Sequence, residues 1–108
     1  MNPIRPLGPA VKAEVAAELN GLPHGRITEH DGAAYVFTDR LTDLELWFLA
    51  LGGQISHQAA GEGVTLWSLN TLTERTHGAP VRVRALALVT DQIDPDCADA
   101  ITTDAPAA

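Results

Sequence analysis

The chain has 108 residues, with 14 acidic and 7 basic side chains and a formal net charge of −7. Its apolar fraction of 45% is too high for a disordered chain, and its length suits one compact domain with a hydrophobic core. Cys97 is the only cysteine, so the sequence excludes a small secreted domain built on internal disulfides. Arginine far outnumbers lysine and alanine is the commonest residue, which is typical of a GC-rich bacterial genome.

The N-terminal segment contains prolines at positions 3, 6 and 9 and no apolar run, unlike a secretory signal. The longest strictly apolar run spans residues 46–51, far short of the roughly 20 residues that a membrane helix needs. We therefore expect a cytoplasmic protein that does not insert into a membrane. Because proline opposes regular hydrogen bonding, residues 1–8 are expected to form an extended arm.

A first helix is predicted to begin at Pro9, since proline suits the first helical turn. Val11, Val15 and Leu19 recur with helical spacing, and this stripe is expected to be the buried face. Gly21 is expected to end the helix.

A β-hairpin is predicted next. Residues 26–30 and 33–38 are rich in β-forming side chains, and Asp31 and Gly32 separate them. Asp-Gly between two such runs favours a type I′ turn, because both central residues of that turn need a positive φ.

A second helix is predicted from Thr38 or Asp39, either of which can cap its first turn, to the glycine pair at 52–53. One broad face of this helix is apolar and is expected to face the core. Its members are Leu41, Leu44, Trp47, Phe48 and Leu51. Leu46 and Leu49 fall on the other side, where a helix exposed to water carries polar residues, so these two leucines need a cover.

After residue 53 the apolar period changes from helical to alternating, which predicts three strands over residues 54–60, 64–72 and 80–90. Both faces of the middle strand carry apolar residues, so the face of Trp67 is left open between core and surface.

The last strand has two unlike faces. One face is apolar throughout and comprises Val81, Val83, Ala85, Ala87 and Val89. The other face begins with Arg82 and Arg84 and becomes apolar at Leu86 and Leu88. Two leucines are therefore predicted on the side of the sheet away from the core.

Asp94 and Pro95 fit the N-cap and the first position of a short helical turn that ends near Ile101, and residues 102–108 are expected to form a flexible tail. The predicted order is α-β-β-α-β-β-β plus this turn. The sequence thus predicts one α+β domain over residues 9–101. It is expected to have two layers, a mainly antiparallel sheet of about five strands with two helices on one face.

The residues that carry chemistry do not form a recognisable motif. The four histidines lack metal-ligand spacing, although His30 and His57 could converge if their strands were neighbours. Ser56 and His57 are adjacent in a strand and point to opposite faces, so they cannot pair as nucleophile and base. We expect no catalytic residue, no metal site and no cofactor. Arg82 and Arg84 alone are too few charges to bind a nucleic-acid backbone, so nucleic-acid binding is not expected.

Our leading hypothesis is a small acidic, non-catalytic binding or regulatory module that acts through self-association, as a homodimer, or through a protein partner. The interface candidates are apolar residues that the predicted core leaves over, namely Leu46, Leu49, Trp67, Leu86 and Leu88. One alternative is a small enzyme or ligand carrier whose pocket lies between the sheet and the second helix and uses His30 or His57. Another is an acidic inhibitor that occupies a basic surface of its partner.

Overall fold

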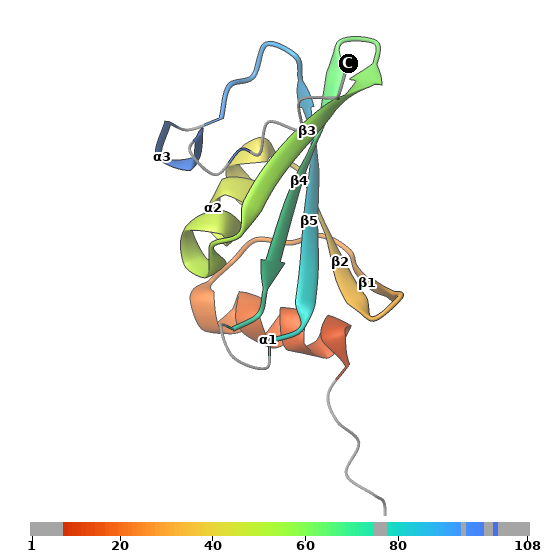
Figure 1. Cartoon of the computed structure of the whole chain (residues 1–108), viewed down its shortest axis with the longest axis vertical. Coiled ribbons are helices and arrows are strands. Elements are labelled where there is room, and N and C mark those ends of the chain that lie inside the picture. Colours follow the sequence, from red (N-terminus) through yellow and green to blue (C-terminus); the bar gives the residue numbers. More distant parts are fainter. Residues whose placement is uncertain (1–7, 75–77, 94, 99–100, 102–108) are drawn as a thin grey trace, which may run out of the picture.

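The structure, a computed structural model, describes residues 8–74, 78–93, 95–98 and 101 of the chain (Figure 1). The elements follow the order α1 (Pro9–Asn20), β1 (Ile27–His30), β2 (Ala33–Thr38), α2 (Leu41–Leu51), β3 (Gln54–Gly61), β4 (Val64–Leu72), β5 (Pro80–Leu88) and α3 (Pro95–Ala98). The predicted order of helices and strands is confirmed. No helix among the described residues is long and apolar enough to cross a membrane.

The strands form one five-stranded sheet in the order β1-β2-β5-β4-β3. Three neighbouring pairs are antiparallel, whereas β2 and β5 run parallel. Along the chain, α2 and the β3–β4 hairpin separate β2 from β5. In the sheet, β5 lies in the middle, where it pairs with β2 on one side and β4 on the other. The α+β class and the mainly antiparallel sheet are confirmed, and the central parallel pair is an addition to the prediction.

Both long helices pack on the same face of the sheet. Val36 of β2, Val83 of β5 and Leu69 of β4 point to that face and are fully buried. They share one core cluster with Ala13 of α1 and Leu44 of α2. Figure 1 shows α1 crossing the foot of the sheet beside the β1–β2 hairpin, while α2 lies alongside the other strands. The opposite face of the sheet has no described helix over it.

The β1–β2 hairpin has the predicted turn. Asp31 and Gly32 have φ values of 51° and 78°, so both central residues are left-handed, as a type I′ turn requires. His30 lies directly opposite Ala33 across the turn. The predicted turn and second strand of the hairpin are confirmed, and β1 begins at Ile27, one residue later than predicted.

The core face of α2 is also confirmed, but its cap is not. Leu44 and Trp47 are fully buried, and the indole Nε1 of Trp47 donates a hydrogen bond to the carbonyl of Pro23 at 2.8 Å. Arg40 occupies the N-cap position, and its side chain makes no hydrogen bond to the first turn of α2. The prediction that Thr38 or Asp39 caps the helix was therefore wrong. The Thr38 hydroxyl instead donates to the backbone carbonyl of Arg84 at 3.2 Å, because β2 extends through Thr38.

The predicted buried stripe of α1 was wrong. Val11, Val15 and Leu19 are exposed, and the buried residues of the helix are Ala13, Ala16 and Ala17. Alanine carries so little side chain that this face can lie close against β1 and β2, whereas a valine and leucine face would hold the helix further away. The Glu29 carboxylate of β1 also accepts a hydrogen bond from the Ala10 backbone N–H at 3.2 Å, which fixes the start of α1 on the hairpin.

The chain ends agree less closely with expectation. The helical turn α3 is described over Pro95–Ala98, and Ile101 forms an isolated parallel bridge with Ile55 at the edge of β3. β5 ends at Leu88, before the predicted residue 90. Residues 1–7 of the expected arm, the expected cap Asp94 and the expected tail at 102–108 lie outside the described residues.

Candidate functional site

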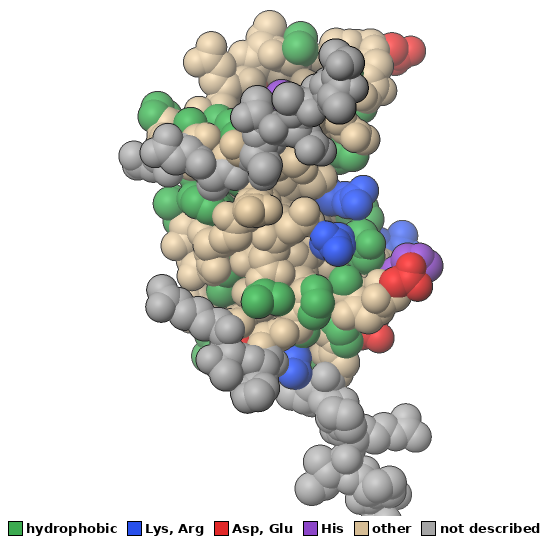
Figure 2. Space-filling model, in the orientation of Figure 1, with side chains coloured by type: hydrophobic (Ala, Val, Ile, Leu, Met, Phe, Trp, Pro, Cys, Tyr) green, Lys and Arg blue, Asp and Glu red, His purple; other side chains and the backbone are tan. Residues whose placement is uncertain are grey.

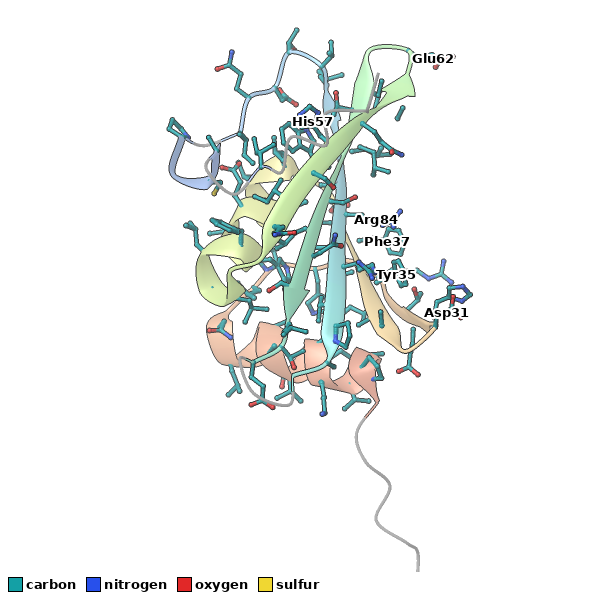
Figure 3. The ribbon with its side chains drawn as sticks, in the orientation of Figure 1. Asp31, Tyr35, Phe37, His57, Glu62 and Arg84 are labelled. Atoms are coloured by element: carbon teal, nitrogen blue, oxygen red, sulfur yellow. The ribbon has the colours of Figure 1, made fainter. Side chains whose placement is uncertain are left out.

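The open face of the sheet is the surface on which two of the sequence-predicted interface residues, Leu86 and Leu88, meet the two strand arginines. β2 contributes Tyr35 and Phe37, and the next strand in the sheet, β5, places Arg82 and Arg84 beside them. Figure 3 shows Tyr35, Phe37 and Arg84 projecting together on the side away from α2. Most of the Lys and Arg side chains visible in Figure 2 lie on the same side of the molecule, next to hydrophobic ones.

One half of the open face is apolar. We call it the Leu86–Leu88 patch, and it consists of Phe37, Val64, Leu66, Leu86 and Leu88. Leu86 and Leu88 are 58% and 60% exposed, and Phe37 is 44% exposed. Cross-strand pairing sets Leu86 opposite Leu66 and Leu88 opposite Val64, so the apolar side chains of β4 and β5 form one continuous area.

A shallow hollow of about 570 Å³ lies at the end of this patch, between the start of α2 and the end of β5. Leu86 and Leu88 line it together with Asp39, Arg40 and Asp91. The Asp91 carboxylate accepts a hydrogen bond from the Leu88 backbone N–H at 3.0 Å, and the Asp91 N–H donates to the Leu88 carbonyl at 2.9 Å. Asp91 therefore closes the backbone of β5 at this end and holds an acidic side chain at the rim.

The other half of the open face is polar. We call it the Arg82–Arg84 hollow. It is a depression of about 450 Å³ over β2, β5, β4 and β3, and it is lined by Leu66 and by the polar residues Tyr35, Ser56, His57, Gln58, Ser68, Asn70, Arg82 and Arg84. Ser56 pairs with Ser68 and Ser68 with Arg84 across three neighbouring strands. These side chains therefore form a row across the sheet.

The two arginines of this hollow have different surroundings. One guanidinium N–H group of Arg82 donates to the Asn70 side-chain oxygen at 2.7 Å. The guanidinium carbon of Arg84 lies 5.3 Å from the centre of the Tyr35 ring, within the range of a cation–π contact. The Nε of Arg84 is buried and has no hydrogen-bond partner.

The remaining interface candidates occupy other places. Leu46 and Leu49, on the outer side of α2, are 46% and 60% exposed, so a second apolar surface exists where the sequence predicted one. Trp67 is only 7% exposed and belongs to the core cluster. It points to the helix-covered face, and it cannot contribute to a surface interface in this structure.

The two histidines that the enzyme alternative offers as acid or base, His30 or His57, do not converge. His30 lies on β1 and His57 on β3, which are the two opposite edge strands of the sheet. The His57 ring packs against Trp67 at 4.7 Å on the helix side, whereas Tyr35 lies on the open face. The described residues contain no group of three or more His, Cys, Asp or Glu side chains that could hold a metal ion. Cys97 is fully buried in the core.

Sequence reasoning found the arginine pair but not its neighbours. The alternation in β5 places Arg82 and Arg84 on one face, and this was foreseen. Ser56, Ser68 and Asn70 could not be added, because the register between β3, β4 and β5 is a tertiary property that no local signal encodes.

A two-layer α+β fold can carry many unrelated activities, so the fold does not determine the function. The function must be argued from the chemistry of the open sheet face. Comparison of the chain with protein-family models, with curated proteins and with solved structures finds no match.

Proposed function

We propose that this protein is a non-catalytic binding module that self-associates through the Leu86–Leu88 patch. The observation that carries the proposal is the exposure of Phe37, Leu86 and Leu88 on a sheet face that no described helix covers. Exposed apolar area of this kind, gathered in one place, is typical of protein interfaces. A cytoplasmic location, expected from the sequence, stays a prediction.

The rim of the patch supports a second copy of the chain as the partner. Arg40 lines the hollow beside Leu86 and Leu88, and the acidic side chains around it are Asp39, Glu45 and Asp91. An apolar centre with both charge signs on its rim can pair with itself, since a two-fold axis sets the acidic side of one copy against the basic side of the other. A purely acidic rim would instead make two copies repel each other.

The energetics favour a weak dimer. Phe37, Leu86 and Leu88 are about half-exposed, so burying each of them completely contributes roughly 1–1.5 kcal/mol. Six such side chains in a dimer contribute roughly 6–9 kcal/mol. Association costs about 4–15 kcal/mol in lost freedom of motion, which leaves a net gain of about 5 kcal/mol at most, so we expect dimers at protein concentrations of about 0.1 mM or higher.

The two alternatives receive less support. An enzyme or carrier site was expected between the sheet and α2, whereas His57 borders the hollow on the open face and His30 lies on the opposite edge strand. An acidic inhibitor of a basic partner remains untested, and it predicts a chain that stays monomeric on its own. The oligomeric state therefore distinguishes it from the proposal.

Sedimentation at increasing protein concentration tests the proposal. We expect the mass to rise from 11.4 kDa toward twice that value. Leu88→Glu should keep the protein monomeric and folded, because it places a charge in the centre of the proposed interface. Leu19→Glu is the matched control, since Leu19 is 80% exposed on α1, away from the patch, and this variant should dimerise as the parent does.

Two results would overturn this assignment. A mass of 11.4 kDa at every concentration would show that the chain does not self-associate. A dimer that survives Leu88→Glu but is lost in Leu46→Glu would assign self-association to the outer side of α2 instead.

A further inference from the structure

We propose that the Arg82–Arg84 hollow is a binding site for the phosphate group of a small phosphate ester. Two guanidinium groups, two serine hydroxyls and two side-chain amides from neighbouring strands surround this one depression of about 450 Å³. This volume falls in the range of small-molecule sites. The inference does not depend on self-association, because the Leu86–Leu88 patch lies further along the strands.

The lining of the hollow can donate many hydrogen bonds and contains no carboxylate. Arg82 and Arg84 supply positive charge, while Ser56, Ser68 and Asn70 supply neutral donors. Neither arginine forms an ion pair with a described carboxylate, although the chain as a whole carries a net charge of −7. In an acidic protein, two neighbouring arginines without acidic partners are a local exception that an anionic ligand would explain.

Arg84 is the strongest single indication. Its Nε is buried without a hydrogen-bond partner. Buried donors without partners are rare in folded proteins and call for an explanation. The Tyr35 ring beside the guanidinium restricts its orientation, so the group is held at the border of the hollow.

Arg82 and Asn70 complete the donor set. Because the Asn70 side-chain oxygen accepts from Arg82, the Asn70 NH₂ group is left as a donor. Asn70 and Arg82 are direct cross-strand partners, and Ser68 and Arg84 form the next pair on the same face. The four side chains therefore border one area from two adjacent strands.

The chemistry favours phosphate over a carboxylate. A phosphate monoester carries nearly two negative charges and three acceptor oxygens near neutral pH, which matches two guanidinium groups and several neutral donors. A single carboxylate has one charge and two oxygens, and one guanidinium can already satisfy it. A nucleic-acid backbone is a poorer candidate, since it needs a long basic stripe and the net charge of this chain is strongly negative.

Titration with phenyl phosphate and with inorganic phosphate, followed by backbone amide NMR shifts, tests the inference at constant ionic strength set with chloride. We expect saturable shifts centred on Ser68, Asn70, Arg82 and Arg84. Arg84→Gln should weaken binding about tenfold or more, because it removes charge-assisted hydrogen bonds. Arg26→Gln removes the same charge at an exposed position outside the hollow and should leave the affinity unchanged.

Further variants keep the test decisive. Ser68→Ala keeps both charges and should weaken binding relative to the parent, which covers the case in which Arg84→Gln fails to fold. Leu88→Glu should still bind phosphate, so a failure of self-association and a failure of phosphate binding are distinguishable. Shifts that do not saturate, equal affinity in Arg84→Gln and the parent, or equal binding of acetate would overturn the inference.

Discussion

The two long helices pack on the same sheet face but use opposite kinds of side chain. α2 buries large residues, with Leu44 and Trp47 fully enclosed, and leaves Leu46 and Leu49 outside. α1 buries alanines and leaves its larger apolar residues exposed. A helical wheel weighted by hydrophobicity therefore identifies the buried face of α2 and misidentifies that of α1.

The difference teaches that the buried face of a helix is set by fit as well as by hydrophobicity. α2 lies over β4 and β5, where it fills the volume above Val83 and Leu69. α1 packs on the β1–β2 hairpin, and its start is tied to Glu29 of that hairpin. Ala13 and Ala17 permit this close approach, since the separation of packed elements depends on the side chains at the contact.

The largest expected effect belongs to α2. Leu44→Ala should lower the free energy of unfolding by about 2 to 5 kcal/mol, because it leaves a cavity in the packed core. Leu46→Ala, two residues further along α2 on its exposed side, should change the free energy of unfolding by about 0.5 kcal/mol or less. Urea denaturation of both variants measures the contrast, and a larger loss for Leu46→Ala would mean that the face of α2 is assigned incorrectly.

Local signals in the sequence were sufficient for most elements of the fold. Asp31 and Gly32 specify the hairpin because their backbone conformation is needed by one turn type. Alternation in β5 separates Val81 and Val83 from the arginines without any knowledge of neighbours. These features are encoded by a few consecutive residues.

What was missed depends on contacts between distant segments. The parallel pairing of β2 with β5 joins residues more than forty positions apart, and no turn signal reports it. The polar lining of the Arg82–Arg84 hollow depends on the register of β3 and β4 for the same reason. The Arg82–Arg84 hollow was therefore visible in the sequence only as two arginines, whereas the sequence also indicated Leu86 and Leu88 of the neighbouring patch.

Overpacking the small-residue face of α1 should have the second largest effect. Ala13 is fully buried, so Ala13→Leu forces α1 away from the hairpin or strains the side chains around it. We expect a loss of about 1 to 3 kcal/mol in the free energy of unfolding. Ala10→Leu is a matched control at a partly exposed position of the same helix. A stability equal to that of the parent would show that the alanine face has spare room.

Straining the turn of the β1–β2 hairpin should have a smaller effect. Gly32→Val places a β-branched residue at φ 78°, which strains the type I′ turn. We expect a loss of about 1 kcal/mol or more, measured by equilibrium denaturation. Gly32→Asn should lose less, because asparagine tolerates the left-handed conformation. An unchanged midpoint for Gly32→Val would mean that the turn can form without positive φ at this position.

The smallest expected effect decides the comparison between the helices most directly. If the stripe of Val11, Val15 and Leu19 were buried, Val15→Ser would remove a core side chain and cost well over 1 kcal/mol. In the structure Val15 is 42% exposed, so the substitution removes little buried area, and serine lowers helix propensity no more than valine does. We therefore expect a change of about 0.5 kcal/mol or less in the free energy of unfolding, measured by urea denaturation beside Ala13→Leu. A destabilised Val15→Ser together with a tolerated Ala13→Leu would reverse the orientation of α1 and leave α2 as the only helix whose packing is described correctly.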